Sequence, residues 1–383
     1  MTAREFASGT DVREESSSER LRVCRIVTTS LTARVLLANQ LRSLSDIDWT
    51  VVSGNPFDPP VEGISVAIIP MSRHLSCSDA LLFLRLIRYL KRQRFDIVHA
   101  STPKASFVGL PAARLAGSTT IYSIHGARYF AEYGRLSNLL GWCFEKWCCT
   151  WATAVLVQSR EDETVLPRAR ICPGSKVRCV GNGIVIHRFL SPVEPALDSH
   201  IPVALMVGRL VREKGVLDFI DLAGRLAGRA DFVHVGWFDR DRNDSLSEDE
   251  VASVSATGRV RFIGAVEDVR PYIASATIVV LPSYREGIPR VAMEAAAMGR
   301  PVAGYNIRGV REVIDPRFGL LAPVGDITAL ARIVGELLGD PVRCDELGKR
   351  CRQDVKERFS ERGVIERLRS VYADISQEYR QAR

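Results

Sequence analysis

Short apolar runs rich in β-branched residues alternate along the chain with longer amphipathic stretches. In the first half these runs lie at Val23–Thr28, Trp49–Ser53, Val66–Ile69, Asp96–His99, Thr120–Ile124, Ala154–Val157 and Val177–Val180. Stretches with helical periodicity, such as Val35–Leu44 and Leu81–Arg92, lie between them. This alternation predicts a parallel sheet wrapped by helices.

The same pattern restarts after a proline-rich link between Ser191 and Pro202. Further strands are expected at Val203–Val207, Phe232–Val235, Val260–Ile263, Thr277–Leu281 and Pro301–Ala303. Residues 363–383 are expected to form a helix that packs back on the first domain. The sequence therefore predicts an α/β fold with two Rossmann-like, doubly wound domains, over residues 21–195 and 200–362, and an interdomain cleft. Ligands of such sheets sit outside the carboxyl ends of the strands.

Composition supports a two-domain globular protein. The 383 residues exceed what one hydrophobic core usually organises, and 46% hydrophobic with 25% charged residues is ordinary for globular chains. Residues 1–20 have too few large apolar side chains to offset the entropy of ordering, so we expect a disordered tail. This tail lacks the basic-then-apolar pattern of a signal peptide. The nine cysteines form no C-x-x-C pair, and reduced thiols are expected.

The longest apolar stretch runs from Leu139 to Val157 and is interrupted by Glu145 and Lys146. A spanning helix needs about 20 predominantly apolar residues, so we do not predict one here. The tryptophan-rich part, Trp142–Trp151, has two interpretations. It is either a helix at a membrane interface, where tryptophan is favoured, or a helix packed in the core.

Positive charge is concentrated between Met71 and Arg114. This segment carries Arg73, Arg85, Arg88, Lys91, Arg92, Arg94, Lys104 and Arg114 against Asp79 and Asp96, whereas the whole chain has a net charge of +7. Such a patch could meet anionic lipid or nucleic acid, or could simply be a solvated helix face. No nucleic-acid-binding motif accompanies it, and we expect no nucleic-acid partner.

The segment Pro282–Pro301 carries the strongest chemical signal. A strand ends at Pro282, Gly287 allows close backbone approach, Pro289 suits the first helical position, and Gly299 ends the helix. Free amides and the positive end of the helix dipole then lie near Gly287–Arg290, a site for phosphate or sugar oxygens. The candidate donor-binding residues of this segment are Glu286, Gly287, Ile288, Pro289, Arg290 and Glu294. One glutamate can reach a sugar and the other a ribose, unless they are a capping residue and a solvent-facing residue.

A second segment, Met206–Val216, places two cations after a strand. Gly208 makes a turn, and Arg209 and Lys214 follow before the next helix. Arginine offers phosphate a bidentate fork, and lysine offers a point charge. This arrangement favours a phosphate site, although surface lysines and arginines are common.

The two segments together resemble family 4 retaining glycosyltransferases of the GT-B fold. Supporting matches lie at Gly181–Ile184, Asp268–Tyr272 and Gly319–Asp326, so the resemblance covers residues from about 22 to 375. It implies that Arg209 and Lys214 hold the donor diphosphate, Glu286 contacts the transferred sugar, and Glu294 binds the ribose hydroxyls. No covalent intermediate and no metal are then required, because the cations and helix-end amides stabilise the leaving group.

The residues at Tyr284–Arg290, Thr102–Ala105 and His125-Gly126 are similar to those of a bacterial subgroup of this family. Members of that subgroup build surface polysaccharides and lipid-linked oligosaccharides. This likeness implies that His125 lies near the reacting sugar, with Lys104 and Thr32 on the acceptor side. His125 could instead be a polar strand-end residue, and Lys104 a surface lysine. The tract Asp239-Arg240-Asp241 mimics a metal-binding D-x-D, but we expect a surface turn without metal there.

The resemblance implies a cytoplasmic enzyme that is peripheral on the inner face of the plasma membrane. Its partners are then a nucleotide-sugar donor, with a UDP-linked hexose or N-acetylhexosamine favoured, a lipid-diphosphate-linked sugar acceptor, and an anionic membrane surface. No cofactor is expected. Two alternatives stay open: a glycosyltransferase acting on a soluble small molecule, and a non-catalytic nucleotide-sugar-binding protein.

Overall fold

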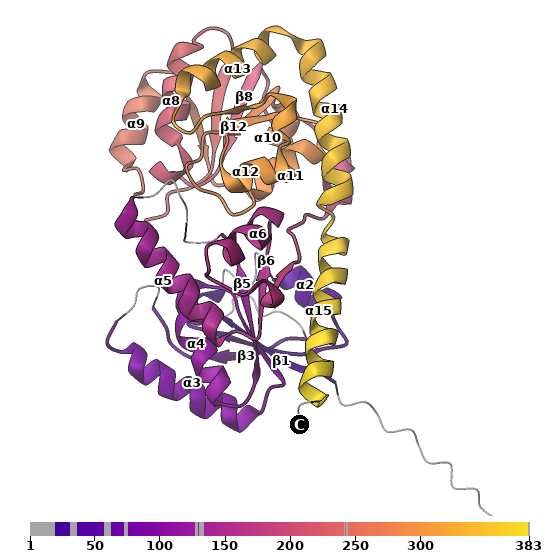
Figure 1. Ribbon diagram of the computed structural model, residues 1–383. Coiled ribbons are helices and arrows are strands. Elements are labelled where there is room, and N and C mark those ends of the chain that lie inside the picture. The colour runs from indigo at the N-terminus through magenta and orange to yellow at the C-terminus, as the bar shows by residue number, and fades with distance from the viewer. Residues whose placement is uncertain are drawn as a thin grey trace, which may run out of the picture.

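The computed structural model describes residues 20–30, 37–56, 63–72, 76–126, 129, 134–240, 242 and 244–381. Two α/β domains are stacked one above the other, and the last two helices run along one side of both (Figure 1). The predicted fold class is confirmed by these two domains and their parallel sheets. Three predictions lie outside the described residues: most of the disordered tail, the position of Thr32, and that of Asp241.

The N-terminal domain contains a seven-stranded parallel sheet with the order β3-β2-β1-β4-β5-β6-β7. Its strands are β1 (Arg22–Val27), β2 (Asp48–Ser53), β3 (Ser65–Ile68), β4 (Ile97–Ala100), β5 (Thr119–Ile124), β6 (Ala154–Val157) and β7 (Val177–Cys179). Each predicted strand is present, with ends that differ by one residue at most. The central strands are buried along their whole length, as expected for a sheet covered on both faces.

Helices cover both faces of this sheet. The helices before the linker are α2 (Ala38–Ser43), α3 (Asp79–Gln93), α4 (Pro103–Leu115), α5 (Arg135–Trp151), α6 (Arg160–Arg168) and α7 (Ile186–Leu190), and a short 3₁₀ turn, η1 (Gly174–Lys176), precedes β7. Residues of α3, α4 and α5 share one hydrophobic cluster with the sheet, whereas α2 packs in the cluster on the opposite face. The helices α3, α4 and α5 therefore form a single layer whose outer side faces away from the sheet.

The C-terminal domain contains a six-stranded parallel sheet with the order β10-β9-β8-β11-β12-β13. Its strands are β8 (Val203–Val207), β9 (Asp231–Val235), β10 (Arg261–Gly264), β11 (Ile278–Leu281), β12 (Val302–Tyr305) and β13 (Leu321–Ala322). The sequence did not predict β13, because two residues are too short for a periodicity to show. It is the edge strand and pairs with β12.

The second group of helices includes the segment that returns to the first domain. The elements are η2 (Arg212–Lys214), α8 (Val216–Arg225), α9 (Glu248–Ala256), α10 (Arg270–Ser275), α11 (Arg290–Ala297), α12 (Arg308–Val313), η3 (Pro316–Phe318), α13 (Ile327–Gly339), α14 (Pro341–Arg358) and α15 (Glu361–Gln381). In Figure 1, α14 lies along the C-terminal domain and α15 continues along the N-terminal one. Leu368, Val371, Tyr372 and Ile375 of α15 are buried in the hydrophobic cluster that contains α2. The end of the chain thus ties the two domains together.

Candidate active site

Lys214 and Glu286 are in direct contact, although they lie in different segments. Lys214 ends η2, Glu286 lies in the loop between β11 and α11, and Lys214 Nζ is 2.6 Å from Glu286 Oε2. The buried Ser283 hydroxyl donates to the other carboxylate oxygen, Glu286 Oε1, at 3.0 Å. Gly215 has φ of 73°, and a Cβ there would lie 1.9 Å from the carbonyl oxygen of Pro282. Only glycine therefore allows the two segments to pack this closely.

Arg209 follows β8 and forms an ion pair with Asp239, with 2.5 Å between Arg209 Nη1 and Asp239 Oδ2. A Cβ at Gly208 would meet no heavy atom of the described residues within 4 Å, so this backbone turn is open. The expected surface turn at 239–241 is correct for Arg240, whose side chain is 79% exposed. It is wrong for Asp239, whose side chain is only 16% exposed and holds Arg209. In this structure both predicted phosphate-binding cations are thus paired with carboxylates.

Glu294 lies on α11, which begins at Arg290, so Pro289 is the residue before the helix and not its first. Arg290 Nε is 3.7 Å from Glu294 Oε1. Burial raises the pKa of Glu294, while the charges of Arg290 and Arg188 act to lower it. Arg188 comes from α7, before the linker, and no sequence motif points to it. The side chain of Ile288 is buried in the core of the C-terminal domain, so only its backbone is available to a donor.

His125 directly follows β5 and faces the loop of the other domain. A Cβ at Gly287 would lie 2.1 Å from the carbonyl oxygen of His125, and one at Gly126 would lie 3.3 Å from the Gly287 Cα. The backbones of the two domains therefore touch at this point, which side chains at either glycine would prevent. His125 is a strand-end residue, as one interpretation held, and it also contacts the predicted donor loop.

The protonation state of His125 follows from its partner. The side-chain amide nitrogen of Gln158 donates to His125 Nδ1 at 2.7 Å, which places the ring proton on Nε2. Nε2 is buried and has no hydrogen-bond partner among the described residues. Burial, with a smaller effect of the Arg25 charge, lowers the pKa of His125 to about 4. His125 is therefore a neutral imidazole with one N–H available to a ligand.

Lys104 is buried at the start of α4, so the interpretation as a surface lysine is wrong. Lys104 Nζ is 2.6 Å from Asp79 Oδ1 and donates to Ser72 Oγ at 2.8 Å. Burial acts to raise the pKa of Asp79, but the hydrogen bonds and charge of Lys104 hold that pKa below its ordinary value. This pair joins the beginnings of α3 and α4, and Asp79 is one of the two acids of the basic segment.

Ion pairs also connect the two domains beside the contact of Gly287 with His125. The residues that form them were not singled out from the sequence. Arg308 Nη1 of α12 donates to Asp162 Oδ1 of α6 at 2.8 Å, and Arg311 Nη2 donates to Glu161 Oε1 at 2.7 Å. Figure 1 shows α6 and α12 next to one another where the two domains meet. These pairs join residues that are far apart in the sequence, so no local motif predicts them.

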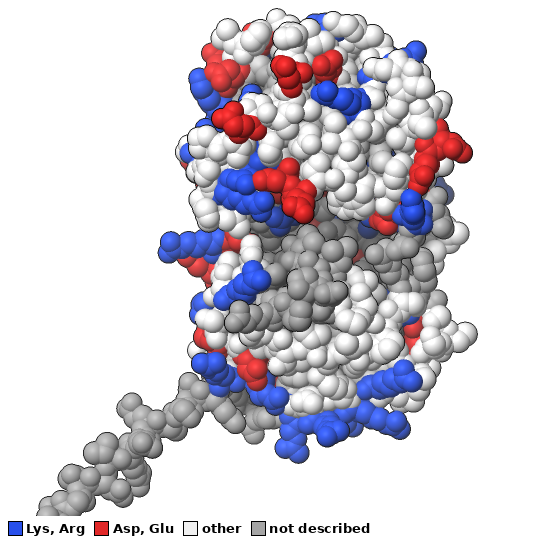
Figure 2. Space-filling model, turned by 180° about the vertical axis from the view of Figure 1, so that it is seen from behind, with Lys and Arg blue, Asp and Glu red and all other residues white. Residues whose placement is uncertain are grey.

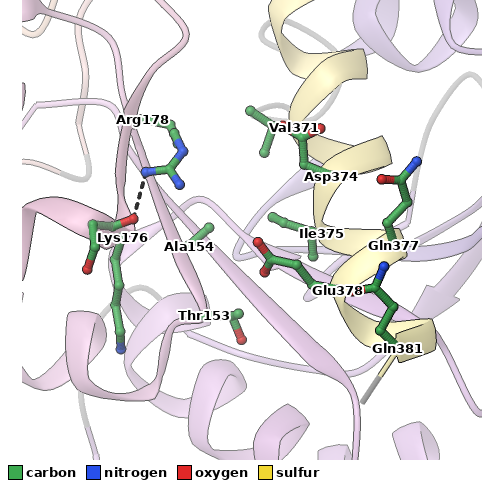
Figure 3. Close-up of a pocket in the computed structure, with 11 residues that line it drawn as sticks. Thr153, Ala154, Lys176, Arg178, Val371, Asp374, Ile375, Gln377, Glu378 and Gln381 are labelled. Carbon is green, nitrogen blue, oxygen red and sulfur yellow. Dashed lines mark hydrogen bonds between the residues drawn. The ribbon is translucent and has the colours of Figure 1, made fainter. Parts of the chain in front are cut away.

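Two hollows lie away from the predicted site residues. One, of about 1100 Å³, lies between the domains and is lined by residues from both, including Asn182, Arg311 and Arg358. The other, of about 370 Å³, lies between α15 and the edge of the N-terminal sheet, where Arg178 lies across from Asp374 and Glu378 (Figure 3). Neither hollow has Lys214, Glu286 or His125 in its lining. We locate the candidate active site where the loop after β11, which bears Glu286, touches the loop after β5, which bears His125.

Two further observations bear on metals and membranes. Within the part of the chain that the structure describes, no group of three or more His, Cys, Asp or Glu side chains is placed to hold a metal ion. No described helix combines the length and the apolar character that crossing a membrane requires.

Two Rossmann-like domains that meet at the loop of Glu286, whose carboxylate pairs with Lys214 from another segment, are the arrangement of a GT-B glycosyltransferase. Two family models match the chain, "Glycosyltransferase Family 4" over residues 35–188 and "Glycosyl transferases group 1" over residues 201–340. The chain belongs to this family of glycosyltransferase enzymes, the group 1 or family 4 glycosyltransferases.

Relatives and solved structures agree with this assignment. The UDP-Gal:alpha-D-GlcNAc-diphosphoundecaprenol alpha-1,3-galactosyltransferase of Escherichia coli is 24% identical over 312 residues, 78% of this chain and 80% of that enzyme. Sucrose-phosphate synthase from Thermosynechococcus elongatus superposes with a TM-score of 0.79 at 20% identity, over 93% of this chain and 99% of that one. HepE of Anabaena, solved in complex with UDP and glucose, has a TM-score of 0.78 at 18% identity, over 92% and 100% of the chains. The two structures share the fold with this chain.

Proposed function

We propose that this enzyme transfers a hexose or N-acetylhexosamine, with retention of anomeric configuration, from a UDP-sugar to a lipid-diphosphate-linked saccharide during surface polysaccharide synthesis. The observation that carries the proposal is the contact between the two loops. It brings the Lys214–Glu286 pair of one domain next to the neutral His125 of the other. The match to an enzyme whose name specifies UDP-galactose and a diphosphoundecaprenol-linked sugar supports the choice of substrates.

The donor diphosphate replaces two carboxylates as the partner of the site's cations. In the structure Arg209 pairs with Asp239, and Lys214 pairs with Glu286. A diphosphate beside the open turn at Gly208 accepts hydrogen bonds from both cations and from the backbone amides at the start of α11. Glu286 is then released toward the sugar, and Glu294 receives the ribose hydroxyls.

Transfer follows from this arrangement of charges. The bond between the anomeric carbon and the diphosphate oxygen breaks while the acceptor oxygen bonds to that carbon on the same face. The leaving diphosphate, stabilised by Arg209 and Lys214, accepts the proton of the acceptor hydroxyl. His125 donates its Nε2–H to a sugar oxygen. No step needs a metal ion, because the two cations and the helix amides balance the charge of the diphosphate.

Lys104 supports the acceptor side in this scheme and does not bind the acceptor as a free cation. Its ammonium is shared with Asp79 and Ser72, and it fixes the start of α3 against α4. Thr102, which precedes α4, accepts a hydrogen bond from the backbone N–H of Thr28 at 2.9 Å. The ends of β1 and β4 are thus held together where an acceptor enters.

The outer side of the layer α3–α5 suits a membrane surface. On α3, Arg85, Arg88, Lys91 and Arg92 are exposed, and Figure 2 shows a band of Lys and Arg along the lower edge of the N-terminal domain, where this helix lies. On α5, an apolar stripe with helical spacing is exposed, and its leucines and tryptophan, Leu136, Leu139, Leu140 and Trp147, are between 40% and 71% accessible. A layer of helices that exposes both basic residues and leucine with tryptophan has the two features of a membrane-interface surface.

Two tryptophans of the tryptophan-rich segment differ in their surroundings. Trp142 donates its indole N–H to the carbonyl of Ala169 and packs inward, whereas Trp147 lies on the exposed stripe. We propose that this surface holds the enzyme peripherally on an anionic membrane, where a lipid-linked acceptor is found.

The decisive experiment is an acceptor comparison with a purified, radiolabelled UDP-sugar panel. We expect transfer to a lipid-diphosphate-linked sugar, and Glu286→Gln should abolish most of it while the protein stays folded. Transfer to soluble sugars alone would favour the small-molecule alternative. UDP-sugar binding without transfer to any acceptor would favour the non-catalytic one.

Vesicle co-sedimentation tests the membrane part separately. Each Lys or Arg near an anionic surface contributes about 1 kcal/mol, so binding to phosphatidylglycerol vesicles should fade with salt and be absent for phosphatidylcholine. Replacing Arg88, Lys91, Arg92 and Arg94 with Gln should weaken it without changing UDP affinity. Binding that ignores lipid charge and salt would contradict this docking surface.

A further inference from the structure

Arg25 is a buried cation in the middle of β1, with 2% of its surface exposed. Its Nη1 donates to His99 Nδ1 at 2.6 Å and to the Tyr372 hydroxyl at 3.1 Å, and its Nη2 donates to Ser101 Oγ at 2.9 Å. Its Nε has no hydrogen-bond partner among the described residues. The Nε–H of Arg25 therefore meets no acceptor in the described interior.

Every partner of Arg25 is electrically neutral. Burial and the neighbouring guanidinium hold the pKa of His99 well below its usual range, so His99 accepts at Nδ1 and donates from Nε2 to Ser123 Oγ at 2.6 Å. Burial raises the pKa of Tyr372, which stays a neutral phenol. No carboxylate of the described residues forms an ion pair with Arg25. The cluster keeps a net charge of +1 in the interior.

Lys104 has a carboxylate partner, whereas Arg25 has none among the described residues. Among the described residues of this domain, Lys104 is the other buried cation, and a carboxylate 2.6 Å away balances it. A buried charge without a partner of opposite sign is strongly unfavourable, which is why buried cations in proteins are normally paired.

A cavity of about 30 Å³ adjoins Arg25. Its polar lining includes Arg25, His99, Ser123, His125, Gln158 and Asn182. The two lining residues Arg25 and His125 each own a buried N–H without a partner, on Nε and Nε2 respectively. The volume exceeds the roughly 10–15 Å³ that one water needs, and it has no space for a sugar ring.

We propose that this cavity binds one small monoanion, a halide or a carboxylate group, between Arg25 and His125. Such an anion balances the guanidinium and accepts hydrogen bonds from the Nε–H of Arg25 and the Nε2–H of His125. A phosphate or sulfate dianion is too large and overcompensates the single charge. The anion is either free in solution or the carboxylate of an acidic sugar that reaches past His125. A free anion competes for the His125 N–H with the sugar oxygen of the transferase reaction proposed above, whereas a sugar carboxylate makes the cavity a subsite of that reaction.

Thermal unfolding of the full chain in halide-free buffer tests the proposal. Sodium chloride and sodium formate should raise Tm along a saturating curve, by about 3 °C at a hundred times the dissociation constant. Sodium sulfate at matched ionic strength should give no saturating component. In Arg25→Met this component should disappear for both anions.

Arg178→Met is the matched control, because it removes one positive charge from the same domain at an exposed position beside the hollow of Figure 3. It should keep the saturating response to formate. An identical response in Arg25→Met and wild type would overturn the proposal, as would the absence of any saturating response in the wild type.

Crystals soaked in sodium bromide give a readout that does not require the variant to fold. An anomalous peak beside Arg25 Nε is expected, and its absence at a bromide concentration that saturates the Tm response would contradict the site. Sodium glucuronate and glucose distinguish the two sources. If only the free anion binds, formate is effective and glucuronate is not. If a sugar carboxylate binds, glucuronate raises Tm in wild type but not in Arg25→Met, and glucose does neither.

Discussion

Two lysines, one in each domain, form ion pairs of the same length in different surroundings. Lys214 and Glu286 keep 18% and 11% of their side-chain surfaces exposed, beside an open backbone turn. Lys104 keeps 2%, is enclosed by Asp79 and Ser72, and joins the starts of two helices. In the function proposed here, the first pair exchanges its carboxylate for a donor phosphate, whereas the second stays closed and holds the fold. The proposal thus contrasts an exchangeable ion pair with a structural one.

Lys214→Ala should show the largest effect on activity. It removes charge stabilisation of the leaving diphosphate and should slow transfer by about 10²–10³, and Arg209→Ala should act in the same direction. The midpoint of thermal unfolding should fall less than in Lys104→Met, because Lys214 keeps 18% of its side chain exposed against 2% for Lys104, and Ser283 still donates to Glu286. Arg212→Ala is the matched control, since Arg212 lies in the same 3₁₀ turn but pairs with Glu250. Equal losses in Lys214→Ala and Arg212→Ala would remove the special role of Lys214.

Lys104→Met should show the converse, a loss of stability with UDP affinity intact. Breaking a fully buried pair costs about 3–5 kcal/mol, and about 2 kcal/mol is expected here because Asp79 keeps 15% of its side chain exposed. Urea unfolding measures this, and Lys104→Met with Asp79→Leu should recover part of the loss. Unchanged stability in the single variant would show that the pair is not structural.

Glu294→Ala should weaken UDP binding by roughly tenfold, since about 1.4 kcal/mol is lost with the ribose hydrogen bonds. Glu286→Gln should lower turnover more than UDP affinity, because it faces the sugar. Isothermal titration and steady-state rates measure the two effects. If Glu294→Ala keeps the wild-type affinity for UDP, its assignment to the ribose is wrong.

Stability should fall as the pH is lowered from about 6.5 toward 4. Burial lowers the pKa of His99, His125 and His234, the latter two to about 4, so the unfolded chain binds protons in this window that the folded chain does not. The raised pKa values of Glu294 and Asp162 act in the opposite direction, and three histidines outweigh them. The free energy of unfolding from urea titrations at pH 7 and pH 5 measures the slope. His234→Phe should reduce it, and a pH-independent stability would contradict the buried neutral state of these rings.

Asp239→Asn should have the smallest effect on this comparison. It frees Arg209 from its ion pair and should change kcat/KM by several-fold, on the scale of about 1 kcal/mol for a partly exposed pair. Arg240→Ala, next to it and exposed, should change nothing. Activity of both variants should persist in excess EDTA. Loss of wild-type activity in EDTA that manganese restores would show that this acidic tract binds a metal.

The positions of the predicted donor-binding residues followed from the sequence because the signals there are local. A strand end, glycines and the helix from Arg290 to Ala297 lie within a few residues of one another, so their spacing placed Glu286 in the loop before this helix and Glu294 within it. Alternation of strands and helices likewise predicted both sheets, apart from the two-residue β13.

Pairings between distant residues could not be read in this way. Arg188 and Arg25 acquire their significance from partners that the fold brings to them, and nothing in their neighbours along the chain distinguishes them from ordinary charged residues. The tract at Asp239 was visible in the sequence, but its ion pair with Arg209 was not. A surface position was one interpretation of Lys104 from the sequence alone. The sequence does not reveal that Lys104 is buried, because burial of a lysine depends on a carboxylate that only tertiary packing supplies.

The most direct test of the exchange on the donor side is a titration of UDP and UMP against wild type, Lys214→Ala and Arg209→Ala. We expect each variant to lose roughly tenfold or more in affinity for UDP, since a charge-assisted hydrogen bond contributes about 1.5–3 kcal/mol, and to lose much less for UMP, which lacks the second phosphate. Affinity for UDP that is unchanged in both variants would contradict it.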